Sequence, residues 1–389
     1  MQPPHESRPG TPARPAGRSS GSPPAVPWKK LLAWYRANRR EMPWRGSRDP
    51  YAVWVSETML QQTRVETVRG YFARFLARFP DVRALAAAGT DDVLKLWEGL
   101  GYYVRARNLH AAARLVAERG GFPATAAEWA ALPGVGPYTA AAVASICAGE
   151  PVPVVDGNVT RVAMRLRAAP GDGRGPGERA AIAAWLRPAV AASGAPGDFN
   201  QAVMELGETL CVPKAPKCLL CPVRAACRAA AEGDPERYPA RRPAKALPVR
   251  RFVAFVARDA AGRALLVQRP ATGLLGGLWE LPMAPVGDAE TRGGASSARR
   301  ALASLGLRAR TLRPLGDVSH VFSHFRQELR VWEAVGAEET RKRKNRAFVH
   351  PAGVAVATAT TRALALRPDP GRGRGGARPL FRRRRRGGG

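Results

Sequence analysis

Four of the five cysteines of this chain gather in one short segment. A run with the spacing Cys-x6-Cys-x2-Cys-x5-Cys is formed by Cys211, Cys218, Cys221 and Cys227. Four thiolates this close in sequence can close around one centre, and four-cysteine sites hold either tetrahedral zinc or an iron–sulfur cluster. Zinc ribbons usually use two Cys-x2-Cys pairs about 15–20 residues apart. This run contains one such pair, so its spacing favours an iron–sulfur cluster.

Glu57 is the first candidate for acid–base chemistry. It lies in the run PYAVWVSETML, and its neighbours along one helix face are Val53, Trp54 and Leu60. A carboxylate on an apolar face must be paired or have a raised pKa, and a raised pKa makes it a general acid near neutral pH. Helix geometry alone slightly favours the alternative, in which Glu57 turns toward solvent or pairs with a distant arginine.

Asp156 is the second candidate. It follows the apolar stretch PVPVV and opens the sequence DGNV, where an aspartate suits a turn or a helix cap. It could also be a carboxylate that faces the same pocket as Glu57 and stabilises a sugar cation during cleavage of an N-glycosidic bond. Such a pair works only if one acid is protonated and the other ionised, so their surroundings should differ.

A glycine loop, LPGVGPYTAAA, occupies residues 132–142. Gly134 and Gly136 would let backbone N–H groups approach an anion, and the helix that follows favours negative charge at its start. No Gly-Lys-Ser/Thr follows and no βαβ unit surrounds the loop, so it is neither a P-loop nor a dinucleotide loop. A tight turn between two helices explains the loop equally well.

Two kinds of structure must position these residues. From Pro27 to Ala231 apolar residues recur every three or four positions, which predicts about ten helices. After a Pro/Arg-rich stretch, RFVAFVARDAAGRALLVQRP reads as a strand, a turn and a strand, and ASSARRALASLGL reads as a helix. We predict a multi-domain chain: a disordered tail at 1–25, an all-α domain at 26–234, a linker at 235–249, an α+β domain at 250–366 and a disordered basic tail at 367–389.

Composition narrows the class of partner. The formal net charge of the 389 residues is +31, which favours a polyanion, and nucleic acid before an anionic membrane. An arginine-rich proteome would also raise this charge. The chain lacks a run of about 18 apolar residues and the apolar core of a signal peptide, so we expect a cytoplasmic protein. In that reducing compartment, clustered cysteines indicate a metal centre rather than disulfides.

Several motifs occur in order along the chain. They are SETMLQQT (56–63), GLGYYVRARNLH (99–110), LPGVGPYTA (132–140), VVDGNVTRV (154–162), FNQAVMELG (199–207), the cysteine run, TGLLGGLWELP (272–282) and FSH (322–324). In this order they resemble the adenine DNA glycosylases of the MutY type, which belong to the helix-hairpin-helix DNA glycosylase superfamily. The resemblance covers most of residues 27–366.

The resemblance implies a fold, an activity and a partner. The fold is an all-α helix-hairpin-helix glycosylase domain with one [4Fe-4S] cluster in the loop 211–227, followed by an α+β Nudix-like domain. The activity is hydrolysis of the N-glycosidic bond of adenine mispaired with 8-oxoguanine or guanine, in base excision repair. We expect a monomer that binds duplex DNA, not membrane, in the bacterial nucleoid.

The resemblance also implies site residues. Glu57 would protonate adenine at N7, and Asp156 would stabilise the sugar cation with support from Asn158 and Tyr138. Gln62 and Tyr102 would intercalate into the duplex. The remaining sets are the hairpin that binds DNA (Gly134, Val135, Gly136), the adenine pocket (Trp44, Arg45, Leu60, Gln201) and the reader of 8-oxoguanine (Phe322, Ser323, His324). Taken alone, these residues are also compatible with solvated, core or loop positions.

Three other functions compete with this interpretation. A Nudix hydrolase needs late glutamates for magnesium, and aligning that motif on residues 305–307 places Arg300, Ala303 and Ser304 there instead. A glycosylase with lyase activity of the endonuclease III type needs a lysine in the slot of Tyr138, and a phenol cannot form a Schiff base. The third alternative is a DNA-binding module without catalytic activity. The two carboxylates argue against it only because the family match makes them catalytic.

Overall fold

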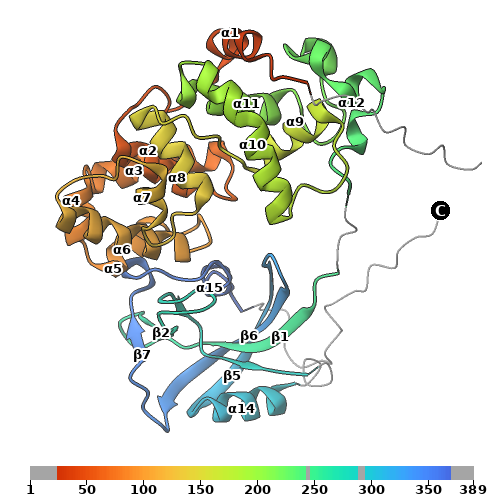
Figure 1. Cartoon of the computed structure of the whole chain (residues 1–389). Helices are drawn as coiled ribbons and strands as arrows, with labels where there is room; N and C mark the ends of the chain where they lie inside the picture. The colour runs from red at the N-terminus through yellow and green to blue at the C-terminus, as the bar shows by residue number, and fades with distance from the viewer. Residues whose placement is uncertain (1–23, 242–245, 288–293, 369–389) are drawn as a thin grey trace, which may run out of the picture.

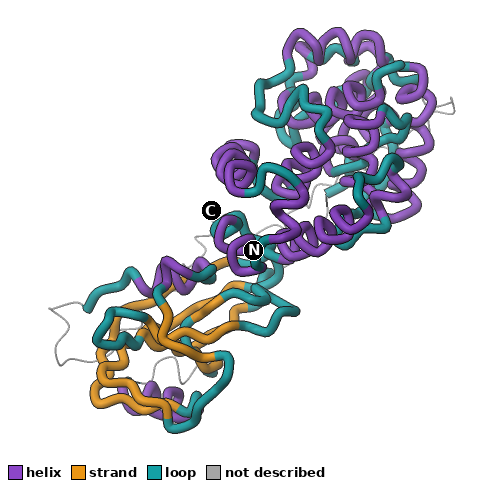
Figure 2. The backbone as a smooth tube through the Cα atoms, turned by 90° about the vertical axis from the view of Figure 1, so that its left-hand side faces the viewer, coloured by secondary structure: helices purple, strands orange, loops and turns teal. Residues whose placement is uncertain are grey.

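The computed structural model describes residues 24–241, 246–287 and 294–368. These residues form a helical region followed by a smaller region of strands and helices (Figure 1). Figure 2 shows the strands gathered at one end of the molecule and most helices at the other. The predicted fold class, all-α then α+β, is confirmed. The two predicted tails lie almost wholly outside the described ranges.

One group of helices forms the first half of the helical region. Its members surround a core that includes Trp54, Phe75, Trp97 and Trp129. They are α2 (Pro50–Leu60), α3 (Val65–Arg78), α4 (Val82–Ala87), α5 (Thr90–Leu96), α6 (Val104–Arg119), α7 (Ala126–Ala130) and α8 (Pro137–Val143), which continues as the π-helix η1 (Ala144–Ala148).

A second group combines the first helix with the later ones. Its separate core includes Tyr35, Val190 and Phe199. The members are α1 (Trp28–Asn38), α9 (Gly157–Arg167), α10 (Pro176–Ala192), α11 (Pro196–Thr209) and α12 (Arg228–Ala231), with short 3-10 turns at η2 (Cys218–Leu220), η3 (Arg224–Ala226) and η4 (Pro235–Arg237). The described helical region therefore has twelve α-helices instead of about ten, because helices as short as α4, α7 and α12 complete too few turns to produce a periodic pattern.

The C-terminal region is built on two sheets. One has the order β4-β1-β6-β5 and the other β3-β2-β7. The strands are β1 (Val249–Val256), β2 (Ala264–Gln268), β3 (Trp279–Glu280), β4 (Met283–Pro285), β5 (Leu307–Val321), β6 (Arg326–Glu339) and β7 (Arg346–Val349), accompanied by α14 (Ala295–Ser304), η5 (Pro351–Gly353) and α15 (Thr358–Leu364). The strands and helix predicted here are present, but β1 and β2 join different sheets.

Side-chain alternation in β1 explains why helices cover both of its faces. Val253 and Phe255 pack into the cluster that contains α14, whereas Ala254 and Val256 pack into the cluster that contains α15. Successive strand residues point to opposite faces, so one buried strand serves two cores. The long hairpin of β5 and β6 ends in the turn 322–325, and its tip points toward the helical region in Figure 1.

The two regions share a packed boundary. Leu278, Ala355 and Ala357 of the C-terminal region belong to the same buried cluster as the core of α2 to α8. Lys95 Nζ donates to Val354 O at 2.9 Å and to Pro351 O at 3.4 Å. Apolar burial and hydrogen bonds to backbone carbonyls thus join α5 to the segment after β7.

Candidate active site

Glu57 lies inside the most apolar helix of the site. Asp49 caps α2 by accepting hydrogen bonds from Tyr51 N at 3.0 Å and Ala52 N at 3.3 Å. Residues 51–59 are all buried, and Glu57 itself is 6% exposed. A helix that is apolar on every side must be surrounded by protein. The structure therefore does not place Glu57 toward solvent, which helix geometry alone had slightly favoured.

Tyr138 is the hydrogen-bond partner of Glu57. Its hydroxyl, on the first turn of α8, donates to Glu57 Oε2 at 2.5 Å. Burial raises the pKa of Glu57 to about 6, and the charge of Asp156 adds to this rise, whereas the Tyr138 hydrogen bond and Arg45 oppose it. Burial and the nearby carboxylates raise the pKa of Tyr138 well above its ordinary value. Tyr138 thus remains a neutral donor near pH 7.

Asp156 caps α9, as its sequence suggested, and it also faces the cavity. It accepts hydrogen bonds from Val159 N at 2.6 Å and from Asn158 Nδ2 at 3.1 Å. Arg161 in turn donates to Asn158 Oδ1 at 2.9 Å and fixes that amide. Burial raises the pKa of Asp156, while the hydrogen bonds from Val159 and Asn158 oppose the rise. More donors therefore face Asp156 than Glu57, which favours an ionised Asp156.

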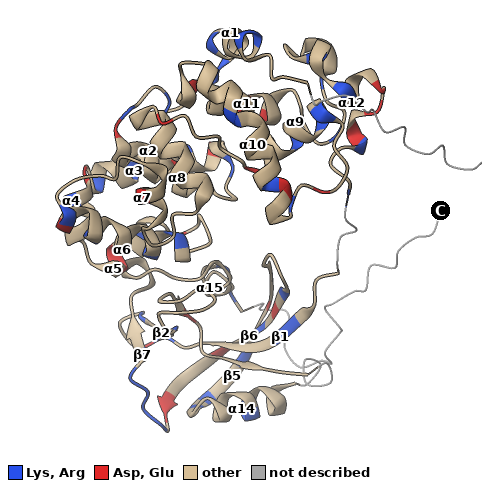
Figure 3. Cartoon of the chain, viewed as in Figure 1, with Lys and Arg blue, Asp and Glu red and all other residues tan. Residues whose placement is uncertain are grey.

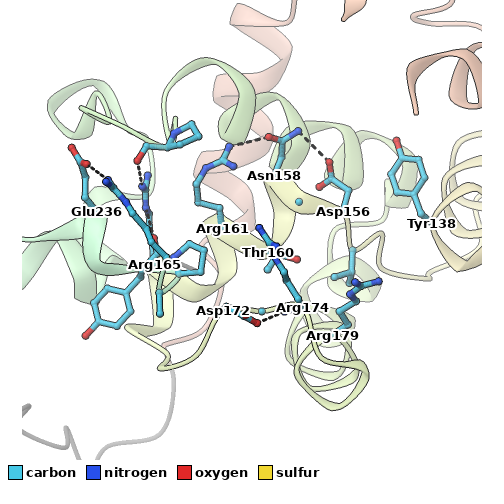
Figure 4. A pocket seen from close by; sticks show the side chains of 18 residues that line it. Tyr138, Asp156, Asn158, Thr160, Arg161, Arg165, Asp172, Arg174, Arg179 and Glu236 are labelled. Carbon is cyan, nitrogen blue, oxygen red and sulfur yellow. Dashed lines mark hydrogen bonds and ion pairs between the residues drawn. The ribbon is translucent and has the colours of Figure 1, made fainter. Parts of the chain in front are cut away.

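The two carboxylates come from different helical groups. Glu57 belongs to α2 in the first group, and Asp156 precedes α9 in the second. A cavity of about 790 Å³ opens beside Tyr138, Asp156 and Asn158, and Asp156 lies between the other two in Figure 4. The arrangement can supply a proton donor and a fixed anion to a ligand held between the groups.

Arg45 meets Gln201 and acts electrostatically on Glu57. Arg45 Nη1 lies 3.4 Å from Gln201 Oε1, and Arg45 Nη2 donates to Glu205 Oε2 at 2.8 Å. Glu205 is 2% exposed and also accepts from Arg40 Nε at 2.6 Å. Sequence reasoning missed Glu205, although a glutamate among the apolar residues of α11 was a signal comparable to that of Glu57.

The other two residues of the predicted adenine pocket lie nearer the core. Trp44 is buried against Phe72 with ring centroids 5.3 Å apart. Leu60 ends α2 and is half-buried beside the same core. The structure therefore brings Arg45 and Gln201 together and gives Trp44 a packing position.

The two predicted intercalating residues share an unusual backbone conformation. Gln62 has a φ of 59° and Tyr102 a φ of 48°. Both side chains are exposed. Left-handed conformations of residues other than glycine cost about 1–3 kcal/mol and concentrate at functional sites. Buried Arg105, which sequence reasoning missed, donates to backbone carbonyls on both loops.

The glycine loop joins α7 to α8. Gly134 has a φ of 73°, and a Cβ there would lie 2.4 Å from Asn108 Cβ, so only glycine fits. Val135 is buried, and Gly136 is the N-terminal cap of α8. The loop is therefore a tight turn between helices whose backbone faces outward at both glycines.

The four cysteines surround one cavity with Arg165. Arg165 Nη1 lies 3.4 Å from Cys211 Sγ and donates to Val212 O at 2.7 Å, while Arg161 Nε donates to Cys211 O at 2.7 Å. Two arginines of α9 thus hold the start of the loop. Within the described residues, no three His, Cys, Asp or Glu side chains are arranged to hold a single metal ion.

The FSH motif forms the turn between β5 and β6. Phe322 stacks on Phe325 with centroids 4.6 Å apart, while Ser323 and His324 are exposed. Ser323 Oγ and His324 Nδ1 lie 3.2 Å apart. A stacked aromatic pair therefore presents two polar side chains at the tip of a long hairpin.

Among the described residues, none of the helices combines the length and the apolar character that spanning a membrane requires.

Sequence comparisons relate both regions of the chain to known families. Residues 55–188 match the HhH-GPD superfamily of base excision DNA repair proteins, and residues 253–366 match the NUDIX domain. The adenine DNA glycosylases of Mus musculus and Rattus norvegicus are each 37% identical over 78% of this chain and 69% of their own length. A thermostable thymine-DNA glycosylase structure aligns with a TM-score of 0.48 and 27% identity over 53% of this chain and 95% of its own.

Proposed function

The chain belongs to the family of adenine DNA glycosylases, and we propose that its substrate is adenine paired with 8-oxoguanine or with guanine. As a member of this family it hydrolyses N-glycosyl bonds and removes adenine in base excision repair. The observation that carries the excision step is the buried Glu57, bonded to Tyr138 and within electrostatic reach of Asp156.

In this proposal Glu57 starts the reaction as a protonated acid. It donates its proton to N7 of an adenine extruded from the duplex, and the bond between N9 and C1′ then breaks with its electron pair moving to adenine. Positive charge develops on the sugar, where ionised Asp156 stabilises it. Water adds to C1′, its proton passes to Glu57, and an abasic sugar and free adenine remain.

Tyr138 and Asn158 support these two carboxylates. Tyr138 orients the Glu57 carboxyl through its hydroxyl, and Asn158 does the same for Asp156 through its amide. A phenol cannot form a Schiff base, and residues 96–213 contain no lysine. We therefore propose hydrolysis without a lyase step.

The cysteine loop has the donors for one [4Fe-4S] cluster. Four thiolates line one cavity without the close grouping that a single ion requires, and a cluster of iron and sulfide holds its thiolates farther apart than zinc does. Cys211, Cys218, Cys221 and Cys227 would be its ligands. When bound, the cluster would supply a rigid cross-link within residues 211–227.

The DNA duplex is the partner in this proposal. The turn 134–136 would hold a phosphate through backbone N–H groups, and Gln62 and Tyr102 would fill the space that the extruded adenine leaves. Phe322, Ser323 and His324 would read the 8-oxoguanine. Lys and Arg residues are spread over both regions (Figure 3), which supports contact with one long polyanion. We propose a monomer acting on nucleoid DNA.

A strand-cleavage assay tests this function. The purified protein is incubated with a duplex that contains one pair of adenine and 8-oxoguanine, with or without later alkali. Product that appears only after alkali supports a glycosylase without lyase activity. Product without alkali contradicts that proposal, and the absence of product contradicts excision.

Asp156→Asn preserves the helix cap, since Asn and Asp cap about equally well, and should abolish excision. A visible absorbance band distinguishes iron and sulfide from zinc.

A further inference from the structure

Two exposed side chains occupy strained backbone in two separate loops. Gln62 follows α2 with a φ of 59°, and Tyr102 precedes α6 with a φ of 48°. Neither residue is glycine, so the surrounding structure must hold each of them in the left-handed region. The source of that support is not evident from the local sequence of either loop.

The same arginine reaches both loops, beginning with the end of α2. Arg105 Nη1 donates to Thr58 O at 2.9 Å, to Met59 O at 2.8 Å and to Gln61 O at 2.5 Å. These carbonyls belong to the last turn of the helix and to the residue just before Gln62. The two N–H groups of one nitrogen thus lie within reach of three carbonyls at the end of α2, where partners within the helix are missing.

The other nitrogen of the same guanidinium holds the second loop. Arg105 Nη2 donates to Leu100 O at 3.3 Å, to Gly101 O at 3.1 Å and to Thr63 Oγ1 at 3.1 Å. The guanidinium carbon also lies 5.6 Å from the centre of the Tyr102 ring. Arg105, which is 7% exposed, therefore bonds through one guanidinium group to residues on both sides of Gln62 and to residues just before Tyr102.

We propose that Arg105 is a positioning residue that holds Gln62 and Tyr102 ready to enter the duplex as adenine leaves it. The inference rests on the proposed glycosylase function and assigns Arg105 no contact with DNA. Lysine cannot replace it, because one ammonium group offers three donors from one point, whereas the planar fork of arginine reaches two separate loops. Ordered loops would lower the entropy lost when both side chains insert.

The experiment compares two duplexes that carry the same pair of adenine and 8-oxoguanine. In one the neighbouring pairs are matched, and in the other they are mismatched, so that adenine leaves the stack more easily. Arg105→Lys should lower single-turnover excision at least about tenfold on the matched duplex and less than about threefold on the mismatched one. An equal loss on both duplexes, or no loss, overturns the proposal.

Arg346 provides a matched control. It is also 7% exposed, and its guanidinium also donates to backbone carbonyls, including Leu305 O at 2.7 Å, but it lies in β7 of the C-terminal region. Arg346→Lys should change excision by the same factor on both duplexes. A selective loss in Arg346→Lys equal to that of Arg105→Lys would contradict a specific role of Arg105.

Two further measurements keep the test decisive. If Arg105→Lys does not fold, Thr63→Val replaces it, because this change removes one acceptor of Arg105. Thr63→Val should lower the excision rate about two- to threefold on the matched duplex alone. An equal loss on both duplexes contradicts the proposal. If the unaltered protein binds DNA without excising adenine, the proposed function fails. Fluorescence of 2-aminopurine in place of adenine then tests extrusion, and Arg105→Lys should weaken the rise that binding causes.

Discussion

Tyr138 and Glu57 are 81 positions apart in the chain, and the hydroxyl of the first donates to a carboxylate oxygen of the second at 2.5 Å. Tyr138 stands two residues after the second glycine of LPGVG, on the first turn of α8. Its hydrogen bond favours the ionised form of Glu57 and so opposes part of the effect of burial. The pair therefore sets the pH range in which Glu57 is a proton donor.

The excision rate should have a bell-shaped dependence on pH. Protonated Glu57 is the active form, so the rate should fall as the pH rises through a pKa of about 6. Ionised Asp156 is also required, so the rate should fall again at low pH, below its raised pKa. Single-turnover rates between pH 4 and 9 measure both limbs.

Tyr138→Phe removes a hydrogen bond that lowers the pKa of Glu57 and should move the alkaline limb to higher pH; a shift to lower pH would contradict this role.

Glu57→Gln should stabilise the fold at alkaline pH while it abolishes excision. The folded protein binds the Glu57 proton more tightly than the unfolded chain does, so the native state loses stability as the pH rises from about 4.5 to about 6, and the loss is complete above that range. A rise in pKa from 4.5 to about 6 corresponds to about 2 kcal/mol in the free energy of unfolding. Urea unfolding at pH 8 should show this gain, and unfolding at pH 4 should not. Glu66→Gln, at a side chain that is 82% exposed, should change the free energy of unfolding by less than about 0.5 kcal/mol.

Glu205→Gln should destabilise the protein by about 3 kcal/mol, because it leaves the charge of Arg45, whose side chain is only 11% exposed, without its carboxylate. Loss of the ion pair between Glu205 and Arg45 should also weaken substrate binding and raise KM. Glu208 offers a control on the same helix, since it accepts from Arg40 at 2.6 Å but is far more exposed. Glu208→Gln should cost less than about 1 kcal/mol. Thermal unfolding compares the two, and equal losses would rule out a special role for Glu205.

His324→Ala should reduce the preference for 8-oxoguanine over guanine opposite adenine. Excision from the pair with 8-oxoguanine should slow about tenfold, a loss of about 1.4 kcal/mol in transition-state stabilisation, while excision from the pair with guanine should stay the same. His350→Ala, an exposed histidine in the same region, should leave both rates unchanged. Equal slowing on the two duplexes would show that His324 contributes general affinity instead.

Local sequence patterns were sufficient where one helix or one turn determines the outcome. The proline at the start of α2, the cap at Asp156 and the strand alternation around Phe255 each depend on neighbours within a few residues. Four of the five cysteines could be grouped for the same reason, because they lie within residues 211–227. Their roles, like those of the two carboxylates, remain predictions.

Relationships between distant segments could not be predicted in this way. Glu205 meets Arg45 across 160 positions, and Arg105 meets Met59 across 46. A single sequence gives no signal for which buried charge pairs with which, since many partners satisfy the same electrostatic need. The direction in which Glu57 faces was uncertain for a related reason: its burial depends on helices packed around α2, not on α2 alone.

The boundary between the two regions has a consequence for DNA binding. Leu278, Ala355 and Ala357 complete the core of the helical region, and Lys95 bonds to two carbonyls of the C-terminal segment. Removing the C-terminal region would expose an apolar patch, so the two regions should unfold together. The separation between the carboxylates and the turn 322–325 is then fixed when the protein folds. The carboxylates and the turn 322–325 therefore already have a fixed spacing when the enzyme meets the duplex. The conformational entropy of arranging these two sites is lost during folding and not during binding.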